Sequence, residues 1–126
     1  MPSRPEETIR AFFEEFNRGD LEALIDLYEP NATMVAQPGQ IAEGHTAIRQ
    51  ALSQFLASNP TLSLEKNSVI TSGDIALSLA QWQLSGTGPD GTPVRMGGTT
   101  SDVLRKQADS RWLFVIDNPW GADILQ

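Results

Sequence analysis

The first half of the chain carries hydrophobic residues at helical spacing. Three stripes follow the i, i+3, i+4 pattern, and their members are Ile9, Phe12, Phe13 and Phe16, then Leu21, Leu24, Ile25 and Tyr28, and then Ile48, Ala51, Leu52, Phe55 and Leu56. Gly19 and Pro30 stand at the ends of the first two stripes, and Asn59-Pro60 ends the third. Because Gly and Pro terminate helices, the pattern predicts three amphipathic helices, with Asp20 capping the second.

After Thr61 the hydrophobic residues alternate with polar ones, which is the spacing of half-buried strands. The alternation is clear over residues 75–82, whereas Val69-Ile70 interrupts it and indicates either a bulge or a separate strand. A turn-rich segment over residues 86–93 precedes one long predicted strand from Val94 to about Lys106, in which Gly97-Gly98 suits a bend. Residues 32–37 predict a shorter strand ahead of the third helix.

The last third of the chain predicts a β-hairpin. Residues 99–105 and 111–121 are rich in strand formers, and a polar turn at residues 108–110 separates them. Helices come first along the chain and an antiparallel meander follows, which predicts an α+β fold with helices on one face of a curved sheet. A length of 126 residues suits a single domain over residues 1–126.

Composition narrows the possible partners. The net charge is −7, which argues against binding to nucleic acid or an anionic membrane surface. The chain has no cysteine and one histidine, His45, which we expect to face solvent, so we expect no metal site and no cofactor. No apolar segment resembles a signal peptide or a membrane span, and we expect a cytoplasmic protein.

Three local patterns in this order resemble the SnoaL-like and ketosteroid-isomerase-like proteins of the nuclear transport factor 2-like superfamily. They are Gly19-Asp20-Leu21-Glu22-Ala23-Leu24 with Asn31-Ala32-Thr33, then Gly44-His45-Thr46-Ala47-Ile48, and then Asp102-Val103-Leu104-Arg105 with Trp120-Gly121. The resemblance implies a cone-shaped fold in which three N-terminal helices pack on a curved antiparallel sheet with a mixed edge. It further implies a conical cavity that holds a small apolar molecule, and a homodimer formed through the outer sheet face.

The resemblance to the isomerases can be compared position by position. Those enzymes place a tyrosine where this chain has Phe12, a general base where it has Ala36 and Gln37, and a protonated aspartic acid where it has Asp102. Only the last position matches. Because proton abstraction needs a positioned base, steroid isomerisation by that mechanism is not expected.

Two interpretations of Asp102 are open. If its strand face is concave, the carboxyl group lies among apolar residues and stays protonated, so that it can donate to a ligand oxygen as an acid–base group. Alternatively it pairs with an arginine, for which the candidates are Arg95, Arg105 and Arg111. The hypothesis of catalysis depends on the first interpretation.

Alternation assigns the neighbouring residues to faces. The family comparison directs the alternate residues of this segment toward the pocket, namely Trp112, Phe114, Ile116, Asn118 and Trp120, and it places Asp117 on the outer face near a possible dimer contact. Asn118 either orients a ligand carbonyl or bonds its own backbone before Pro119.

The remaining ligand-binding candidates are Tyr28, Trp82, Phe12, Phe55 and Gln37. For Tyr28 the alternative is a core residue with a solvated hydroxyl group, and for Trp82 and Phe55 it is plain core packing. Gln37, like Gln81, is a polar candidate whose face the sequence does not determine.

We predict a small-molecule-binding SnoaL-like protein with an apolar pocket. Whether it is an enzyme is left open. If it is, it is a cofactor-free isomerase, cyclase or dehydratase for a carbonyl- or phenol-bearing compound, because such pockets combine apolar walls with a few polar groups. The alternative, favoured by the missing base, is a non-catalytic ligand-binding or protein-association module of the same fold.

Overall fold

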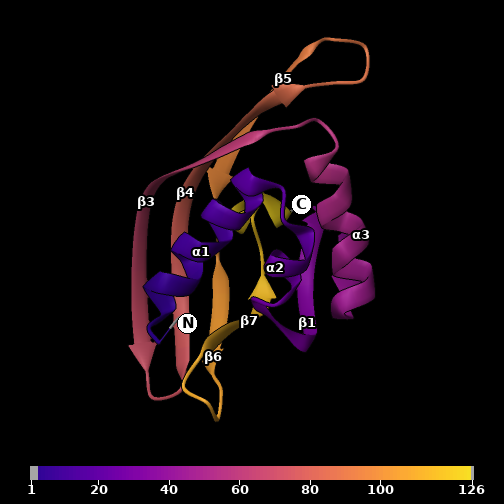
Figure 1. Ribbon diagram of the computed structural model, residues 1–126. Helices are drawn as coiled ribbons and strands as arrows, with labels where there is room; N and C mark the ends of the chain where they lie inside the picture. The colour runs from indigo at the N-terminus through magenta and orange to yellow at the C-terminus, as the bar shows by residue number, and fades with distance from the viewer. Residues whose placement is uncertain (1–2, 126) are drawn as a thin grey trace.

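Three helices pack on the concave side of a seven-stranded mixed sheet (Figure 1). The computed structural model describes residues 3–125. The helices are α1 (Pro5–Arg18), α2 (Leu21–Ile25) and α3 (Gly44–Leu56). The strands are β1 (Tyr28–Gln37), β2 (Gln40–Glu43), β3 (Thr61–Ser72), β4 (Ile75–Thr87), β5 (Pro93–Thr99), β6 (Asp102–Lys106) and β7 (Trp112–Asp117), and a 3-10 helix, η1 (Gly121–Ile124), follows. The predicted α+β cone is confirmed.

The order of strands in the sheet places the first strand, β1, beside the last strand, β7. The order is β2-β1-β7-β6-β4-β3, and β5 pairs with β4 off this path. β1 runs parallel to β7, and the other pairs are antiparallel. α1 packs against β3 and α3 packs against β1, so the helices cover the concave face. The site described below lies between these two helices and the sheet.

The second helix is shorter than its hydrophobic spacing predicts. Asp20 caps it as expected, since its carboxylate accepts the backbone N–H of Ala23 at 3.1 Å. The helix ends at Ile25, however, and Tyr28 is the first residue of β1. The backbone N–H of Phe114 donates to the Leu27 carbonyl oxygen at 2.9 Å, so pairing with β7 draws this segment into the sheet. The prediction that Tyr28 ends a helix is wrong because strand pairing outweighs the local spacing.

The long strand predicted over residues 94–106 is divided into β5 and β6. The break falls at Thr100-Ser101, where the backbone N–H of Thr100 donates to Ala80 at 2.8 Å and its hydroxyl accepts the Ala80 N–H at 3.0 Å. β5 pairs with residues 81–87 of β4 and β6 pairs with residues 75–78. Both strands run antiparallel to β4, so the chain keeps its direction across this break.

Strand β3 settles the choice between a bulge and a separate strand, and strand β2 adds an element to the predicted ones. β3 is one continuous strand, with a register shift between Leu64 and Lys66 that identifies a bulge ahead of Val69-Ile70. β2, which the sequence did not predict, pairs with β1. No helix within residues 3–125 has the length and hydropathy that a membrane crossing requires.

Candidate functional site

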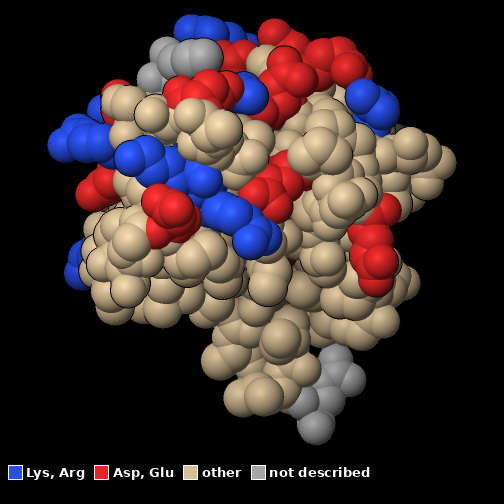
Figure 2. All heavy atoms as spheres, turned by 90° about the horizontal axis from the view of Figure 1, so that it is seen from below, with Lys and Arg blue, Asp and Glu red and all other residues tan. Residues whose placement is uncertain are grey.

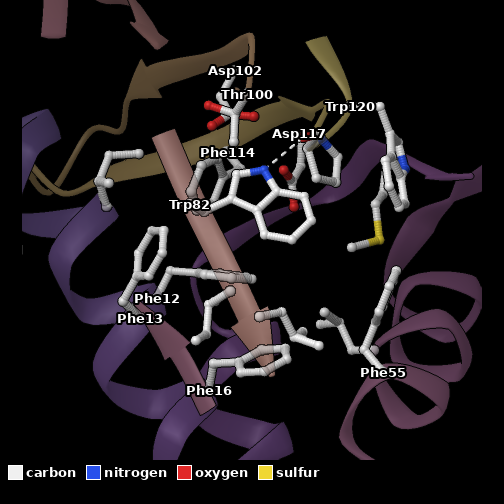
Figure 3. Close-up of a pocket in the computed structure, with 16 residues that line it drawn as sticks. Phe12, Phe13, Phe16, Phe55, Trp82, Thr100, Asp102, Phe114, Asp117 and Trp120 are labelled. Atoms are coloured by element: carbon white, nitrogen blue, oxygen red, sulfur yellow. Dashed lines mark hydrogen bonds between the residues drawn. The ribbon is translucent and has the colours of Figure 1, made fainter. Parts of the chain in front are cut away.

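Two buried carboxyl groups lie side by side on the paired strands β6 and β7. Asp102 is 3% exposed and Asp117 is 6% exposed. Both side chains point from the sheet into the concave side of the molecule, from which the helices approach (Figure 3). A pair of acidic groups in apolar surroundings is costly unless the groups share protons or have hydrogen-bond donors.

The inward position of Asp117 comes from a bulge in β7, and the prediction that it faces outward is wrong. Leu104 lies opposite Phe114, whereas its neighbour Val103 lies opposite Ile116. One residue of β7 is therefore extra at this point, and an extra residue reverses the alternation of inward and outward side chains. The prediction that Ile116 faces the pocket is wrong for the same reason, because Ile116 faces outward with 41% exposure and Asp117 faces inward.

Neutral donors hold both carboxyl groups in place. The Tyr28 hydroxyl donates to Asp117 Oδ2 at 2.5 Å, and the backbone N–H of Asn118 donates to Asp102 Oδ1 at 3.0 Å. The Thr100 hydroxyl lies beside Asp102, and the two carboxyl groups lie close enough to affect each other's pKa. Because the charge on one carboxyl group changes the pKa of the other, the pair acts as one titrating unit.

Burial raises the pKa of both carboxyl groups above the usual value of an aspartic acid. For Asp102 the charge of Asp117 raises the pKa further, to well above that value. The hydrogen bond from Tyr28 opposes this rise at Asp117 by lowering its pKa. Burial also raises the pKa of Tyr28 well above its usual range, so the phenol stays protonated and remains a donor.

The alternative in which an arginine neutralises Asp102 is wrong. Arg105 pairs with Glu29 at 2.9 Å and Arg111 pairs with Asp109 at 2.9 Å. The third candidate, Arg95, is exposed on β5. No ion pair reaches Asp102 within residues 3–125.

The carboxyl pair opens onto an apolar cavity of about 70 Å³. Its lining residues come from the helices, the sheet and the segment after β7, and they are Ile9, Phe12, Phe13, Phe16, Met34, Leu52, Phe55, Leu62, Trp82, Leu84, Thr100, Asp102, Phe114, Asp117, Pro119 and Trp120. Figure 3 shows the labelled aromatic rings arranged around this space, with both aspartates at one end of it. The walls are therefore mainly aromatic, and the polar groups gather at one place.

Two indole groups fix part of the wall. Trp82 Nε1–H donates to the Pro119 carbonyl at 2.8 Å, and Trp120 Nε1–H donates to the Val35 carbonyl at 3.0 Å. The two indole rings meet edge to face at 5.9 Å. These contacts tie the segment after β7 to β4 and β1.

Four of the predicted ligand-binding residues line the cavity, namely Phe12, Phe55, Trp82 and Trp120. Tyr28 does not line it, but its hydroxyl reaches Asp117. The Asn118 side chain binds local backbone instead, donating to Gly121 O at 3.1 Å and accepting the Trp120 N–H at 3.3 Å. Gln37 is exposed and lies outside the lining.

Sequence reasoning missed the inward direction of Asp117. The available signal is an aspartate at the end of the apolar run Trp112-Leu113-Phe114-Val115-Ile116, but alternation without the bulge directs it to the wrong face. His45 also differs from expectation, because it is half-buried with Nε2 2.9 Å from the Tyr28 carbonyl oxygen. No group of three or more His, Cys, Asp or Glu side chains that could hold a metal ion occurs in the described part of the chain.

Comparisons with solved structures agree with this fold. A nuclear transport factor 2-like superfamily protein from Salmonella enterica matches with a TM-score of 0.81 at 19% identity, covering 91% of this chain and 86% of that one. A candidate dehydratase of the same family from Streptomyces avermitilis matches with a TM-score of 0.75 at 22% identity, covering 89% of each chain. A candidate ketosteroid isomerase from Shewanella frigidimarina matches with a TM-score of 0.74 at 20% identity, covering 88% of this chain and 90% of that one.

At these identities the structural likeness shows the fold alone. The chain matches none of the curated proteins with which its sequence was compared. Family membership comes from the sequence of residues 9–115, most of the chain, which matches the SnoaL-like domain. The resemblance inferred from the sequence is thereby confirmed, and the chain belongs to the SnoaL-like domain family, with the nuclear transport factor 2-like fold.

Proposed function

We propose that this protein binds a small, largely apolar compound bearing a carbonyl or phenol oxygen and transfers a proton on it. The reaction class is isomerisation, cyclisation or dehydration. The observation that carries the proposal is the pair of buried carboxyl groups, Asp102 and Asp117, at one end of an aromatic cavity. An apolar pocket with a few convergent polar groups of perturbed pKa is typical of a catalytic site.

The pair supplies both roles that proton transfer needs. Asp102, at the position that resembles the protonated aspartic acid of the isomerases, donates its proton to the ligand oxygen, and Asp117 accepts a proton from a neighbouring carbon. In an isomerisation Asp117 then gives this proton to another carbon of the resulting enol while Asp102 takes back the proton from the oxygen, which releases the product and restores the starting state. Asp117 thus replaces the base that is missing at Ala36 and Gln37.

The structural neighbours support the reaction class at a coarse level. Their names include a candidate dehydratase and a candidate ketosteroid isomerase, both carrying this fold. These names describe those proteins. For this chain they support testing dehydration and isomerisation first.

The second candidate function is non-catalytic binding of a ligand or a protein. The size of the cavity favours association with a protein, because about 70 Å³ is less than half of the ~150 Å³ that accommodates benzene in an engineered apolar cavity. In this alternative the carboxyl pair serves structure.

The test is a turnover assay with cyclic β,γ-unsaturated ketones and β-hydroxy ketones, comparing the wild type with Asp102→Asn and Asp117→Asn. Under the catalytic proposal each variant loses about 10²- to 10⁴-fold in kcat/KM, the usual contribution of a positioned acid or base. Equal rates in the wild type and both variants would contradict it. Binding of the ketones without turnover in the wild type would support the non-catalytic alternative.

We propose in addition that the outer sheet face pairs with a second copy of the chain. Four apolar side chains form a row across this face, from β3 through β4 and β6 to β7, and they are Ile70, Leu77, Val103 and Ile116. Leu77 and Ile116 are 39% and 41% exposed. Seen from below, charged side chains gather over one part of the molecule and the lower part of the view carries none (Figure 2). An exposed apolar row of this kind favours association.

A further inference from the structure

We infer, on the basis of the proposed function, that the cavity takes an uncharged compound with a single ring and one hydrogen-bonding oxygen, and that Phe12 sets this size limit. The residues that line the cavity determine the class of ligand, and the packing of its rings makes Phe12 the residue that excludes larger ligands.

The charge of the ligand follows from the residues that face it. Among residues 3–125, no lysine, arginine or histidine lines the cavity, and the ionisable side chains of its lining are those of Asp102 and Asp117. A ligand carboxylate or phosphate would lie beside two acidic groups without a counter-charge, in surroundings that strengthen repulsion. A neutral oxygen can accept a hydrogen bond from the protonated member of the pair at no such cost.

The size of the ligand follows from the volume of the cavity. The cavity measures about 70 Å³, so even one ring requires a boundary side chain to turn aside. Phe55 is suited to this movement, because it is half-buried and its ring neighbours Trp120 at 6.5 Å, without further ring partners among the described residues. Trp82 and Trp120 are fixed by their indole hydrogen bonds.

Phe12 is the aromatic wall that resists such movement. Its ring contacts four other rings, with centroid distances of 5.9 to 6.4 Å, and these belong to Phe13, Phe16, Tyr28 and Phe114. Two of these contacts, to Tyr28 and Phe114, are edge-on beside the carboxyl pair. A second ring that extends toward α1 from the carboxyl pair would meet Phe12, so a smaller residue there opens the cavity beside the pair.

The experiment is an NMR titration of the isotope-labelled protein with phenol, 2-naphthol and benzoate. The indole N–H resonances of Trp82 and Trp120 report on the cavity, and that of Trp112 is an internal control, because Trp112 is buried outside the lining. The variants are Phe12→Ala and Phe12→Leu, the latter in case the larger truncation does not fold. Phe55→Leu is the matched control, because it makes the same change on another wall.

We expect phenol to shift the Trp82 and Trp120 resonances of the wild type. We expect 2-naphthol to bind at least about tenfold more weakly than phenol, which is the effect of a steric mismatch in an apolar pocket. Benzoate leaves both resonances unchanged. In Phe12→Leu the preference for phenol over 2-naphthol falls about tenfold, whereas in Phe55→Leu it stays as in the wild type.

Several results would overturn the inference while leaving the proposed function standing. They are equal binding of phenol and 2-naphthol by the wild type, binding of benzoate as tight as that of phenol, and a change of preference in Phe55→Leu as large as that in Phe12→Leu. If neither phenol nor 2-naphthol shifts the two resonances in any folded variant, the cavity does not bind such compounds. That result contradicts the proposed function itself, and the inference with it.

Discussion

At the residue scale, the two buried carboxyl groups make the stability of the fold depend on pH. Their pKa values are raised in the folded state above the value of 3.8 for a free side chain, so the folded protein holds protons that the unfolded chain releases. The contribution of the pair to stability is therefore greatest at pH values below the pKa of the unfolded chain. It decreases as the pH rises through the pKa of the folded state. The pair thus opposes folding at neutral pH, which fits a group kept for function.

The decrease of stability with rising pH leads to a prediction for Asp117→Asn. As the pH rises above the unfolded pKa of 3.8, the free energy of unfolding should fall less steeply in the variant than in the wild type, because one of the groups with a raised pKa is gone. Urea denaturation at several pH values measures the slope. Asp109→Asn is the matched control, since the pKa of this exposed residue is lowered by its contacts with Arg111. An unchanged slope in Asp117→Asn would contradict the raised pKa.

Tyr28 and Thr100 allow the two carboxyl groups to be distinguished. Tyr28→Phe removes the donor to Asp117, so the pKa of Asp117 should rise, whereas Thr100→Val removes the hydroxyl beside Asp102 and should raise the pKa of Asp102. Carbon-detected NMR titration of the carboxyl resonances measures both. If the pKa of neither carboxyl group changes in Tyr28→Phe, the hydroxyl does not control the pair.

At the scale of elements, the segment after β7 closes one side of the cavity and depends on a single glycine. Gly121 has a φ of +56°, and a side chain there would overlap the carbonyl oxygen of Thr99. The neighbouring Asn118 amide and the Trp120 indole hold the segment in place. The wall that Trp120 forms is therefore set by backbone geometry as well as by its own hydrogen bonds.

Gly121→Ala should lower the free energy of unfolding by at least about 2 kcal/mol, because it combines an unfavourable φ with a steric overlap. Gly39→Ala is the control, since Gly39 has a φ of +85° with nothing within 4 Å of the added Cβ, and it should cost only about 1 kcal/mol. Chemical denaturation measures both variants. Equal losses would mean that the contact with Thr99 is relieved by a small movement.

At the scale of the whole molecule, the sheet has two apolar faces, one covered by helices and the other exposed. The concave face is covered by α1 and α3, whereas the outer face presents the row of Ile70, Leu77, Val103 and Ile116 to solvent. The proposed second copy would cover this row without touching the cavity. Association and ligand binding are then separable by mutation.

Leu77→Lys should convert the proposed dimer to a monomer, because it places a charge in the middle of the row. Light scattering coupled to size-exclusion chromatography measures the mass. Ile124→Lys is the matched control, since Ile124 is 40% exposed, like Leu77 at 39%, but lies in η1 away from the row. A wild-type protein with the mass of one chain at high concentration would contradict the proposal.

The sequence by itself determined the three helices and most strands, because hydrophobic spacing and Gly and Pro positions act locally. The family followed from the resemblance of three local patterns to known proteins. It also indicated Asp102 as an acid and the aromatic wall of Phe12, Phe55, Trp82 and Trp120. Tertiary structure decided where Tyr28 and Asp117 lie. Pairing with β7 extends Tyr28 into a strand, and one extra residue in β7 turns Asp117 inward. Strand register depends on partners distant in sequence, so no local pattern could join these residues to Asp102 in one site.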